Sequence, residues 1–523
     1  MQTLLLKLYK AAEISEDVYK EIRPTGSMRP RMYGVAKVHK PDIPLRPILA
    51  MIGSPQHATA KWLAKTLAPV SEKYSTYVVK DRFRFSEEIR QRSVPSSTRM
   101  YSYDIKSLFT NVPLEEAIQI CAKDLHHTDT EPPSLTEKSF VKLIRKVTAG
   151  VEFSFDDTMF QQTDGVAMGS PLGPVLANIF VGYYEQRLNI DKRSDILMYK
   201  RYVDDTFAMQ IEEQSSTNFL SELNSLHPAL QFTCEREKDN KLPFLDVLVN
   251  RKHSDSEPNI TFETTIYRKP TFTGQYTRWD SFTARKYKTN LIKCLVNRAM
   301  KICSPNLLEM EIENLRQIFT GNGYPQNIIN KVMDAALNAT AKPYGPKRCP
   351  VYLRLPWKGR GPAERTEIAV TSTVRATYPT CDVRVVYGTR HAFPDSIKDI
   401  LPTHSKSNVI YLFKCWCGSQ YVGKTTQRLE MRIKQHQPTA KSLASKQTTK
   451  SSSSSSIADH LTQNMDCLNK FDKTMFSVVC KARTEAVLHV LEPLYIRSLK
   501  PTLCKQMEFV KCMHLFPNGS GSS

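Results

Sequence analysis

The chain has 523 residues, of which 41% are hydrophobic and 24% are charged. These fractions are ordinary for a globular protein of roughly three domains, and they exclude a disordered, highly charged chain. The 73 lysines and arginines exceed the 52 acidic residues and give a net charge of +21. Such an excess favours a polyanionic partner, most often nucleic acid; a basic, solvated surface is the alternative.

Two features of the sequence bear on location. The first ten residues carry two lysines and no cleavage site follows them, and the 12 cysteines form no even framework, so we expect no signal peptide and a reducing compartment. The longest uncharged run, residues 165–184, contains several glycines and prolines. We interpret it as a loop that leads into a buried helix, and we expect a soluble protein without a membrane partner.

In chain order, residues 1–80 mix basic and apolar residues with turn signals. From about 100 to 250, apolar strand-like segments alternate with helical stretches and predict an α/β or α+β core; the segments are 101–105, 198–203 and 245–249. Apolar residues at helical spacing predict an amphipathic helix over 286–303.

Composition changes near Lys342. Residues 342–364 are rich in proline and glycine and predict a connector between domains. A second compact unit begins near residue 400, and its serine-rich stretch 441–456 predicts a flexible surface insertion.

Three acidic positions in the first unit stand at the ends of expected strands. Asp104 follows a short apolar strand, and Asp204 and Asp205 occupy the expected turn of a hairpin over 198–209, where neighbouring side chains can approach each other. Three carboxylates suit phosphoryl transfer assisted by two divalent metal ions about 3.5–4 Å apart. For the Asp204–Asp205 pair alone, an exposed turn is the alternative.

The order of several short blocks resembles the reverse transcriptases of Penelope-like retroelements. The blocks are YGVAKVHKP with PLRPI, DIKSLFTNVP, GVAMGSPLGP, YVDD and LPFLDV, and the resemblance spans roughly residues 30–300. It implies that Asp104, Asp204 and Asp205 bind the catalytic Mg²⁺ or Mn²⁺ ions of a polymerase palm. It also implies that this metal-binding site adds nucleotides from deoxynucleoside triphosphates to a DNA primer, with RNA as the template.

The same resemblance implies substrate-binding residues. Lys37 and Arg46 would hold the incoming triphosphate, with plain surface charge as the alternative. Phe109 would exclude a 2′-hydroxyl, with core packing as the alternative. Gln162 and the turn from Gly165 to Ser170, including Gly169, would shape the nucleotide and template pocket.

Two positions further along are less specific. Asp246 is expected to be structural. The basic and aromatic stretch 267–276 would either grip a primer strand or form a plain hairpin.

A second constellation lies in residues 409–436, where two strand-like pieces end in tyrosines and a helix carries Arg428, Arg432 and His436. Two phenols, a guanidinium and an imidazole suit phosphodiester cleavage when a carboxylate holds one metal ion. The stretch resembles the GIY-YIG nuclease domain. That resemblance implies a site of Tyr411, Tyr421, Arg432, His436 and a metal-binding Glu492, with Glu485 as the competing carboxylate.

Two departures and one addition accompany this resemblance. Val409 stands in place of the first glycine, a change that Penelope-like members tolerate. Cys504 stands where related sequences often carry Asn, and this second departure predicts weaker folding or activity. Penelope-like nucleases add a zinc site, which here would use Cys415, Cys417, His460 and Cys467. Free thiols are the alternative.

Together the resemblances imply an α+β multidomain protein: a right-hand polymerase with fingers, palm and thumb, followed by a small α/β nuclease domain. The expected boundaries are 1–80 for the fingers, 81–255 for the palm, 256–341 for a thumb-like helical region, 342–400 for the connector and 401–523 for the nuclease. The implied function is target-primed reverse transcription in the nucleus, where the nuclease nicks DNA and the polymerase extends the 3′ end.

Two other readings of the sequence stay open. One is a domesticated copy that only binds nucleic acid, and the other is a nuclease whose polymerase half is a binding platform. Only about thirty residues precede the first finger block, so a truncated reading frame is a further expectation.

Overall fold

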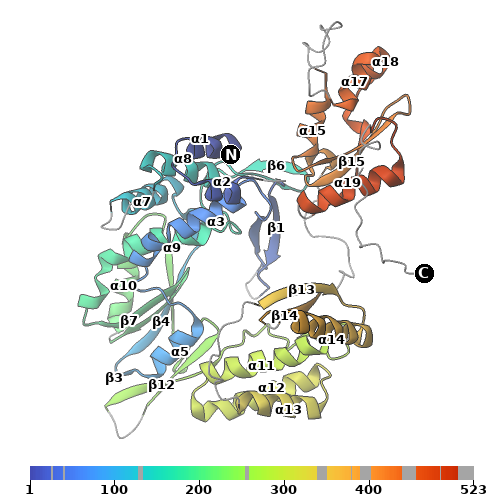
Figure 1. Cartoon of the computed structure of the whole chain (residues 1–523). Helices are drawn as coiled ribbons and strands as arrows, with labels where there is room; N and C mark the ends of the chain where they lie inside the picture. The colour runs from blue at the N-terminus through green and yellow to red at the C-terminus, as the bar shows by residue number, and fades with distance from the viewer. Residues whose placement is uncertain are drawn as a thin grey trace.

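A computed structural model of the whole chain is shown in Figure 1. It describes residues 1–24, 28–38, 42–127, 134–211, 213–253, 258–338, 350–378, 380–388, 402–438, 455–482 and 485–504, without the side chains of 213–217 and 486. Most of the predicted insertion, 441–454, lies outside these residues. In the described part, no helix is both long enough and apolar enough to cross a bilayer.

The N-terminal region combines short helices with an exposed β-sheet. Its helices are α1 (Gln2–Lys10), α2 (Glu16–Ile22), α3 (His57–Thr66) and α4 (Ala68–Lys73). The sheet has the order β2-β1-β5-β6, made of β1 (Arg31–Ala36), β2 (Leu45–Ala50), β5 (Glu152–Phe155) and β6 (Thr158–Gln161). Strands β5 and β6 fall in the range predicted for the palm, so that boundary does not follow the sheets.

The central sheet is antiparallel and has the order β7-β8-β4-β9. Its strands are β4 (Arg99–Ile105), β7 (Ile196–Tyr202), β8 (Asp205–Gln210) and β9 (Phe232–Arg236). The helices that accompany it are α6 (Leu108–Asn111), α7 (Leu114–His126), α8 (Glu137–Thr148), α9 (Gly173–Glu185) and α10 (Glu213–Ser225). The predicted strands at 101–105 and 198–203 are confirmed, and the apolar run 165–184 is a loop followed by the buried helix α9.

A third sheet packs with four helices around a second apolar core. This sheet has the order β10-β11-β12-β3, with β3 (Ser93–Pro95), β10 (Lys241–Phe244), β11 (Val247–Lys252) and β12 (Asn259–Ile266). It packs with α5 (Arg82–Arg90) and with α11 (Arg285–Ile302), α12 (Pro305–Gly321) and α13 (Gln326–Leu337) in one apolar cluster. The helix predicted over 286–303 is confirmed as α11. The boundary expected at residue 255 falls between the paired strands β11 and β12, so it does not separate two packing units.

The region predicted as a connector contains a folded strand–helix–strand unit. Strands β13 (Pro350–Pro356) and β14 (Asp382–Gly388) pair in parallel, and α14 (Arg360–Thr377) makes the crossover that parallel pairing requires. Pro350 and Pro356 stand at the two ends of β13, and Pro362 lies in the first turn of α14, where a missing N–H costs little. The proline content therefore indicated a linker where the chain in fact folds.

The C-terminal unit is a small α/β domain that stands at the upper right of Figure 1. Its antiparallel sheet has the order β16-β15-β17, with β15 (Val409–Lys414), β16 (Gln420–Thr425) and β17 (Phe476–Lys481). Helices α15 (Leu429–His436), α17 (Ser456–Gln463), α18 (Met465–Asn469) and α19 (Glu485–Leu499) complete it. Short 3-10 segments lie at Gln186–Leu188, Ile190–Lys192, Thr403–Ser405 and Lys473–Met475.

Candidate functional sites

The three acidic residues of the central sheet meet at one end of adjacent strands. Asp104 on β4 lies directly opposite Asp205 on β8 in the antiparallel register, so their side chains share a face, with Cβ atoms about 5 Å apart. Asp204 occupies the two-residue turn between β7 and β8, and its carbonyl oxygen accepts a hydrogen bond from the Ile105 amide at 3.0 Å. The predicted hairpin is confirmed, with Asp204 in its turn and Asp205 as the first residue of β8.

The chemistry of this acidic group fits hard divalent cations. Asp104 and Asp204 are half-buried and Asp205 is exposed, so a bound ion would be reached from solvent on one side. Mg²⁺ and Mn²⁺ prefer carboxylate oxygens and retained water, and three carboxylates at one strand end offer such ligands. The site can therefore hold the ions that phosphoryl transfer uses.

A glycine-rich loop leads from β6 of the first sheet to α9 and passes close to β2 and α6. A Cβ at Gly169 would lie 2.1 Å from the Leu49 carbonyl oxygen of β2, and the Leu49 amide donates to the Met168 carbonyl at 2.7 Å. A Cβ at Gly165 would lie 2.7 Å from the Thr110 carbonyl oxygen of α6. Both glycines have positive φ, so their backbone conformation also favours glycine. The loop can pass between the two elements only because it lacks side chains there.

The remaining predicted pocket residues lie on both sides of this loop. Phe109 is half-buried, packs on the central core and accepts a hydrogen bond from the Val166 amide through its carbonyl. The Gln162 side chain donates to the carbonyls of Asp164 and Gly165 at 3.1 and 2.9 Å. Gln162 thus shapes the loop itself, and Phe109 both packs in the core and borders the loop.

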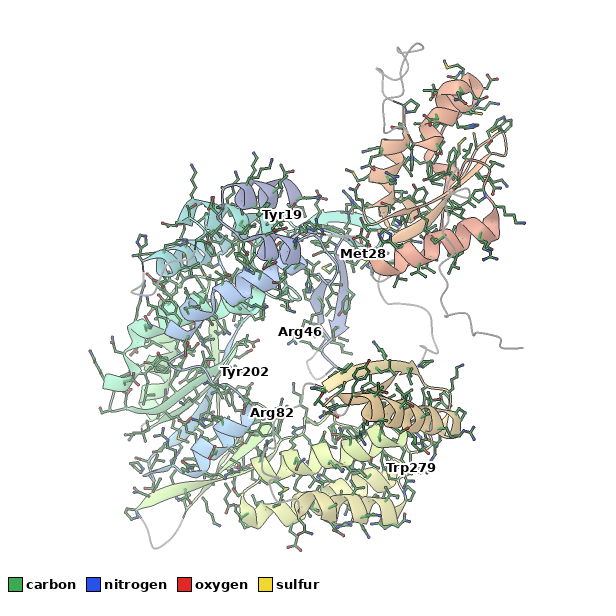
Figure 2. All side chains as sticks on the ribbon, viewed as in Figure 1. Tyr19, Met28, Arg46, Arg82, Tyr202 and Trp279 are labelled. Carbon is green, nitrogen blue, oxygen red and sulfur yellow. The ribbon has the colours of Figure 1, made fainter. Side chains whose placement is uncertain are left out.

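Lys37 and Arg46 belong to the β1–β2 hairpin. Arg46 is exposed and pairs with Val35 across the hairpin, while the Lys37 amide donates to the Pro44 carbonyl at 2.9 Å. Figure 2 shows Arg46 on this hairpin and Tyr202 at the end of β7 on facing sides of the central region. The structure thus places Arg46 on β2 and Lys37 directly after β1.

Asp246 lies at the tight β10–β11 turn and pairs with Arg82 of α5 and with Arg298 of α11, the latter at 3.4 Å. It thereby links a turn to two helices, as expected of a structural residue. Residues 267–276 form no hairpin; part of this irregular segment lines a surface cavity of about 290 Å³ with Asp246 and Arg298.

In the C-terminal unit, three of the predicted residues form a hydrogen-bonded chain. The Tyr411 Oη of β15 lies 2.6 Å from His436 Nε2, and Arg432 Nε donates to the same Oη at 3.3 Å. His436 Nδ1 lies 2.7 Å from Ser455 Oγ. We assign the ring proton to Nδ1, so that Tyr411 donates to Nε2.

Burial sets the protonation of this chain. Desolvation, with Arg432 adding to it, lowers the pKa of His436 to about 3, so the ring is a neutral proton acceptor near pH 7. Burial also raises the pKa of Tyr411 above its ordinary value, while the Arg432 guanidinium opposes that rise. Both shifts keep the phenol and the imidazole neutral, with Tyr411 as the hydrogen-bond donor and His436 as the acceptor.

The close approach of the two tyrosines depends on Gly423 in β16. A Cβ at this position would lie 2.6 Å from Tyr411 Oη and 2.7 Å from a ring carbon of Tyr421. Tyr421 is half-buried, and the rings of Tyr411 and Tyr421 have centroids 6.3 Å apart. Glycine at 423 therefore admits both phenols to one site.

The structure distinguishes the two candidate carboxylates. The Glu492 side chain of α19 is 13% exposed, accepts from the Lys424 amide at 3.1 Å and pairs with Lys424 Nζ at 2.7 Å. Its charge also acts on the pKa of Tyr411, Tyr421 and Arg432. The Glu485 side chain is 62% exposed and pairs only weakly with His489 at 3.8 Å. Glu492 is thus the carboxylate that faces the tyrosines, and Lys424 is a partner that the sequence did not predict.

The four predicted zinc ligands come together from separate elements. Cys415 and Cys417 follow β15, His460 lies on α17 and Cys467 on α18, and their ligand atoms lie within 4.8 Å of one another. His460 Nε2 is 3.3 Å from Cys415 Sγ and 3.5 Å from Cys417 Sγ. Nitrogen and sulfur ligands on tetrahedral zinc are roughly 3.6 Å apart, from bonds of about 2.05 and 2.3 Å. The donor set and its spacing therefore fit zinc.

Cys504 makes the contacts that its position requires. Its thiol accepts from the Val422 amide at 3.3 Å and donates to the Val422 carbonyl at 3.2 Å. An asparagine amide has the same pair of donor and acceptor, so the thiol replaces both of its functions. These contacts give no structural reason for the weaker folding or activity that was expected of a cysteine at this position.

Comparisons with known proteins identify two regions. Residues 38–242 match the family described as reverse transcriptase (RNA-dependent DNA polymerase), and residues 275–334 match the animal helix-turn-helix domain. The chain therefore contains a reverse transcriptase domain, and α11, α12 and most of α13 fall in a helix-turn-helix match that the sequence analysis had read only as helices. No curated protein matches the chain.

Solved polymerase structures resemble the chain at low identity. A telomerase from Candida albicans with a TWJ fragment of telomeric RNA is 11% identical, with 64% of this chain and 62% of that chain covered and a TM-score of 0.41. The sicinivirus 3Dpol RNA-dependent RNA polymerase is 12% identical, with 62% and 71% covered and a TM-score of 0.39. A Candida tropicalis telomerase truncated from its C-terminal domain is 11% identical, with 43% and 53% covered and a TM-score of 0.33. The chain thus spans less than two thirds of either telomerase chain.

Proposed function

We propose that the chain is an RNA-directed DNA polymerase in which Asp104, Asp204 and Asp205 hold two divalent metal ions. The observation that carries the proposal is the placement of Asp104 opposite Asp205 beside the Asp204 turn, inside the reverse transcriptase domain. The ions supply activation of the primer hydroxyl and neutralisation of the leaving pyrophosphate.

The protein side chains position the reactants. The reaction forms a bond from the primer 3′-hydroxyl oxygen to the α-phosphorus of the nucleotide and releases pyrophosphate. Arg46 and Lys37 on the β1–β2 hairpin bind the triphosphate as cations. Phe109 beside the glycine loop excludes a 2′-hydroxyl by its bulk, and Gln162 and Gly169 keep the loop in shape for the nucleotide and the template RNA.

Primer extension tests this function. Purified parent protein receives an RNA template, a DNA primer, deoxynucleotides and Mg²⁺, beside Asp204→Asn and Asp239→Asn variants. Asp239 is exposed in a turn with positive φ, which asparagine tolerates, so it controls for the chemistry of the substitution. We expect extension by the parent and by Asp239→Asn, and a loss of at least ~100-fold in Asp204→Asn. Equal extension by all three proteins would contradict the assignment.

We further propose that the C-terminal unit is a GIY-YIG DNA endonuclease. The supporting observation is the chain from Arg432 through Tyr411 to His436, with Glu492 facing the same tyrosines. Tyr411, held by its hydrogen bond to His436, orients the attacking water, and Arg432 stabilises charge on the phosphate. Tyr421 borders the site. One metal ion on Glu492 would supply Lewis acidity, after displacing Lys424. A structural zinc on Cys415, Cys417, His460 and Cys467 would fix the loop between the two tyrosines.

A nicking assay on supercoiled DNA tests the nuclease. Glu492→Gln removes the buried carboxylate, while Glu485→Gln changes the exposed one on the same helix. We expect nicking by the parent and by Glu485→Gln, and none by Glu492→Gln. Loss of nicking in Glu485→Gln alone would assign the metal to the competing residue.

The two activities on one chain, with its blocks resembling Penelope-like elements, support target-primed reverse transcription. The nuclease would nick nuclear DNA, and the polymerase would extend the released 3′ end on the RNA of the element. A truncated or domesticated copy is the competing candidate, and the excess positive charge is equally consistent with it. Binding of RNA without extension or nicking by the parent would favour that copy.

A further inference from the structure

A buried polar network lies beneath the acidic turn. The Arg201 side chain of β7 is 0% exposed, and its Nε pairs with Glu185 Oε1 of α9 at 2.7 Å, where the glutamate side chain is 1% exposed. Tyr199 Oη donates to the same Oε1 at 2.8 Å, and Arg201 Nη1 donates to Asn178 Oδ1 at 2.9 Å. Arg201 is therefore held in one orientation by α9.

The same guanidinium reaches the turn itself. Arg201 Nη1 also donates at 3.0 Å to the carbonyl of Val203, which lies two residues further along the chain in the turn. The Arg201 backbone is fixed in turn, because its amide donates to the Tyr77 carbonyl and its carbonyl accepts from the Val79 amide, both at 2.8 Å. One side chain thus connects a rigid helix to the peptide that precedes Asp204.

The turn needs such support because of its conformation. Val203 has φ of +59°, a region that a β-branched residue rarely adopts. Asp204 is not among the residues with positive φ, so the turn resembles type II′, which favours glycine at the Val203 position. A valine keeps this conformation only when surrounding contacts determine it. Two of these are the Arg201 bond to the Val203 carbonyl and the Ile105 bond to the Asp204 carbonyl.

A purely stabilising role does not explain the choice of residues. Buried ion pairs often contribute no more stability than apolar residues of similar volume. Here one arginine nitrogen, Nη2, has no hydrogen-bond partner in the described part of the chain, a further cost of burial. What an apolar pair would lack is the donor aimed at the Val203 carbonyl.

We propose that Arg201 is a positioning residue for the polymerase reaction, held by Glu185 and Asn178, and that it fixes the Val203–Asp204 turn so that Asp204 and Asp205 face Asp104. The inference rests on the proposed polymerase function. Arg201 touches neither substrate nor metal; it acts through the backbone of the turn. Removing it should therefore lower kcat and metal affinity more than it changes the KM for nucleotides.

The first test removes the buried charges together. Arg201→Met with Glu185→Gln leaves no unpaired buried charge and keeps an acceptor for Tyr199, so the protein should fold, with a Tm within a few degrees of the parent. We expect kcat for primer extension to fall about 30-fold, KM for the nucleotide to change less than about threefold and Mn²⁺ binding at the aspartates to weaken about tenfold. Mn²⁺ binding is measured by calorimetry against Asp204→Asn. A folded double variant with parental kcat and Mn²⁺ affinity would overturn the proposal.

The second test asks how Arg201 acts. Val203→Gly introduces the residue that a type II′ turn prefers, so the turn then depends less on its hydrogen bond to Arg201. When Val203→Gly is already present, we expect Arg201→Met with Glu185→Gln to lower kcat less than about fivefold. An undiminished 30-fold loss there would show that Arg201 does not act through the turn.

The two proposals fail in different ways. A parent that extends no primer yet binds Mn²⁺ at the aspartates would sink the polymerase function, while the Mn²⁺ affinities of the variants would still decide the positioning role. A parent that binds no Mn²⁺ at the aspartates would overturn both.

Discussion

Replacing Gly169 by alanine should damage the polymerase, because among the described glycines of the reverse transcriptase domain its Cβ would make the closest contact. The added Cβ would lie 2.1 Å from the Leu49 carbonyl oxygen, whereas real Cβ contacts begin near 3.0 Å, so β2 and the loop must separate by about 0.9 Å. A shift of that size breaks the bond from the Leu49 amide to the Met168 carbonyl, and the alanine also adopts φ of +119°.

The expected losses of folding free energy and of kcat/KM follow from the broken hydrogen bond, the strained backbone and the shift of β2. Loss of the hydrogen bond costs about 1 kcal/mol and the strained backbone about 1–3 kcal/mol of folding free energy. β2 carries Arg46, the residue proposed to bind the triphosphate, so on that proposal the nucleotide would be displaced by about 1 Å, which corresponds to a fall of roughly 100-fold in kcat/KM for the nucleotide.

The assay is single-nucleotide incorporation on an RNA template, with urea unfolding as the measure of stability. Gly361→Ala is the matched control, because a Cβ at this helical position of α14 meets nothing within 4 Å. We expect that control to be unchanged in rate and slightly more stable. A Gly169→Ala protein with parental kcat/KM would refute the reasoning that the loop sets the position of β2.

Three further predictions concern the C-terminal unit. Gly423→Ala should abolish nicking while leaving primer extension intact, because its Cβ would lie 2.6 Å from Tyr411 Oη; nicking at the parental rate would contradict this. The pKa of His436 is lowered to about 3, below its unfolded value, so its contribution to stability is complete above pH ~6.5 and is lost as the pH falls toward 3. Between pH 6.5 and 4, the Tm of a His436→Gln protein should fall less than the Tm of the parent. Equal falls in Tm for the two proteins would count against the lowered pKa of His436. We expect about one equivalent of zinc in the parent by elemental analysis. Cys467→Ser should lower both this zinc content and the Tm, whereas Cys294→Ser, which changes an exposed thiol, should alter neither.

Local patterns in the sequence were sufficient for several elements. Apolar strand-like runs on both sides of Asp204 and Asp205 predicted the β7–β8 hairpin, because a short polar break between two strand patterns has few other folds. Helical spacing predicted α11. Glycines and prolines within the apolar run 165–184 predicted a loop ahead of α9.

Other features depend on partners that are distant in the chain, and periodicity does not reveal these. The pairing of β5 with β1 joins residues 154 and 31, so the first sheet crosses the predicted boundary of the fingers. The β13–α14–β14 unit was hidden because its prolines occupy strand ends and a first helical turn, where they are tolerated.

In the candidate sites too, local motifs predicted some residues, whereas partners that are distant in the chain were not predicted. The motifs predicted residues that the structure brings near one another, such as Tyr411 and Glu492. They did not identify Arg201, because an arginine within an apolar strand gives no sign of whether it faces solvent or a buried glutamate 16 positions earlier. Lys424 was missed for the same reason, since its pairing with Glu492 spans 68 positions.

The central claim is that Asp104, Asp204 and Asp205 form one metal-dependent polymerase site. Its most direct test is the single-turnover rate of nucleotide addition to a DNA primer on an RNA template, measured across a Mg²⁺ titration for the parent, Asp204→Asn and Asp239→Asn. The account predicts a saturable Mg²⁺ dependence shared by the parent and Asp239→Asn, and no addition by Asp204→Asn at any Mg²⁺ concentration. Addition by Asp204→Asn at the parental rate, or by the parent without divalent metal, would contradict it.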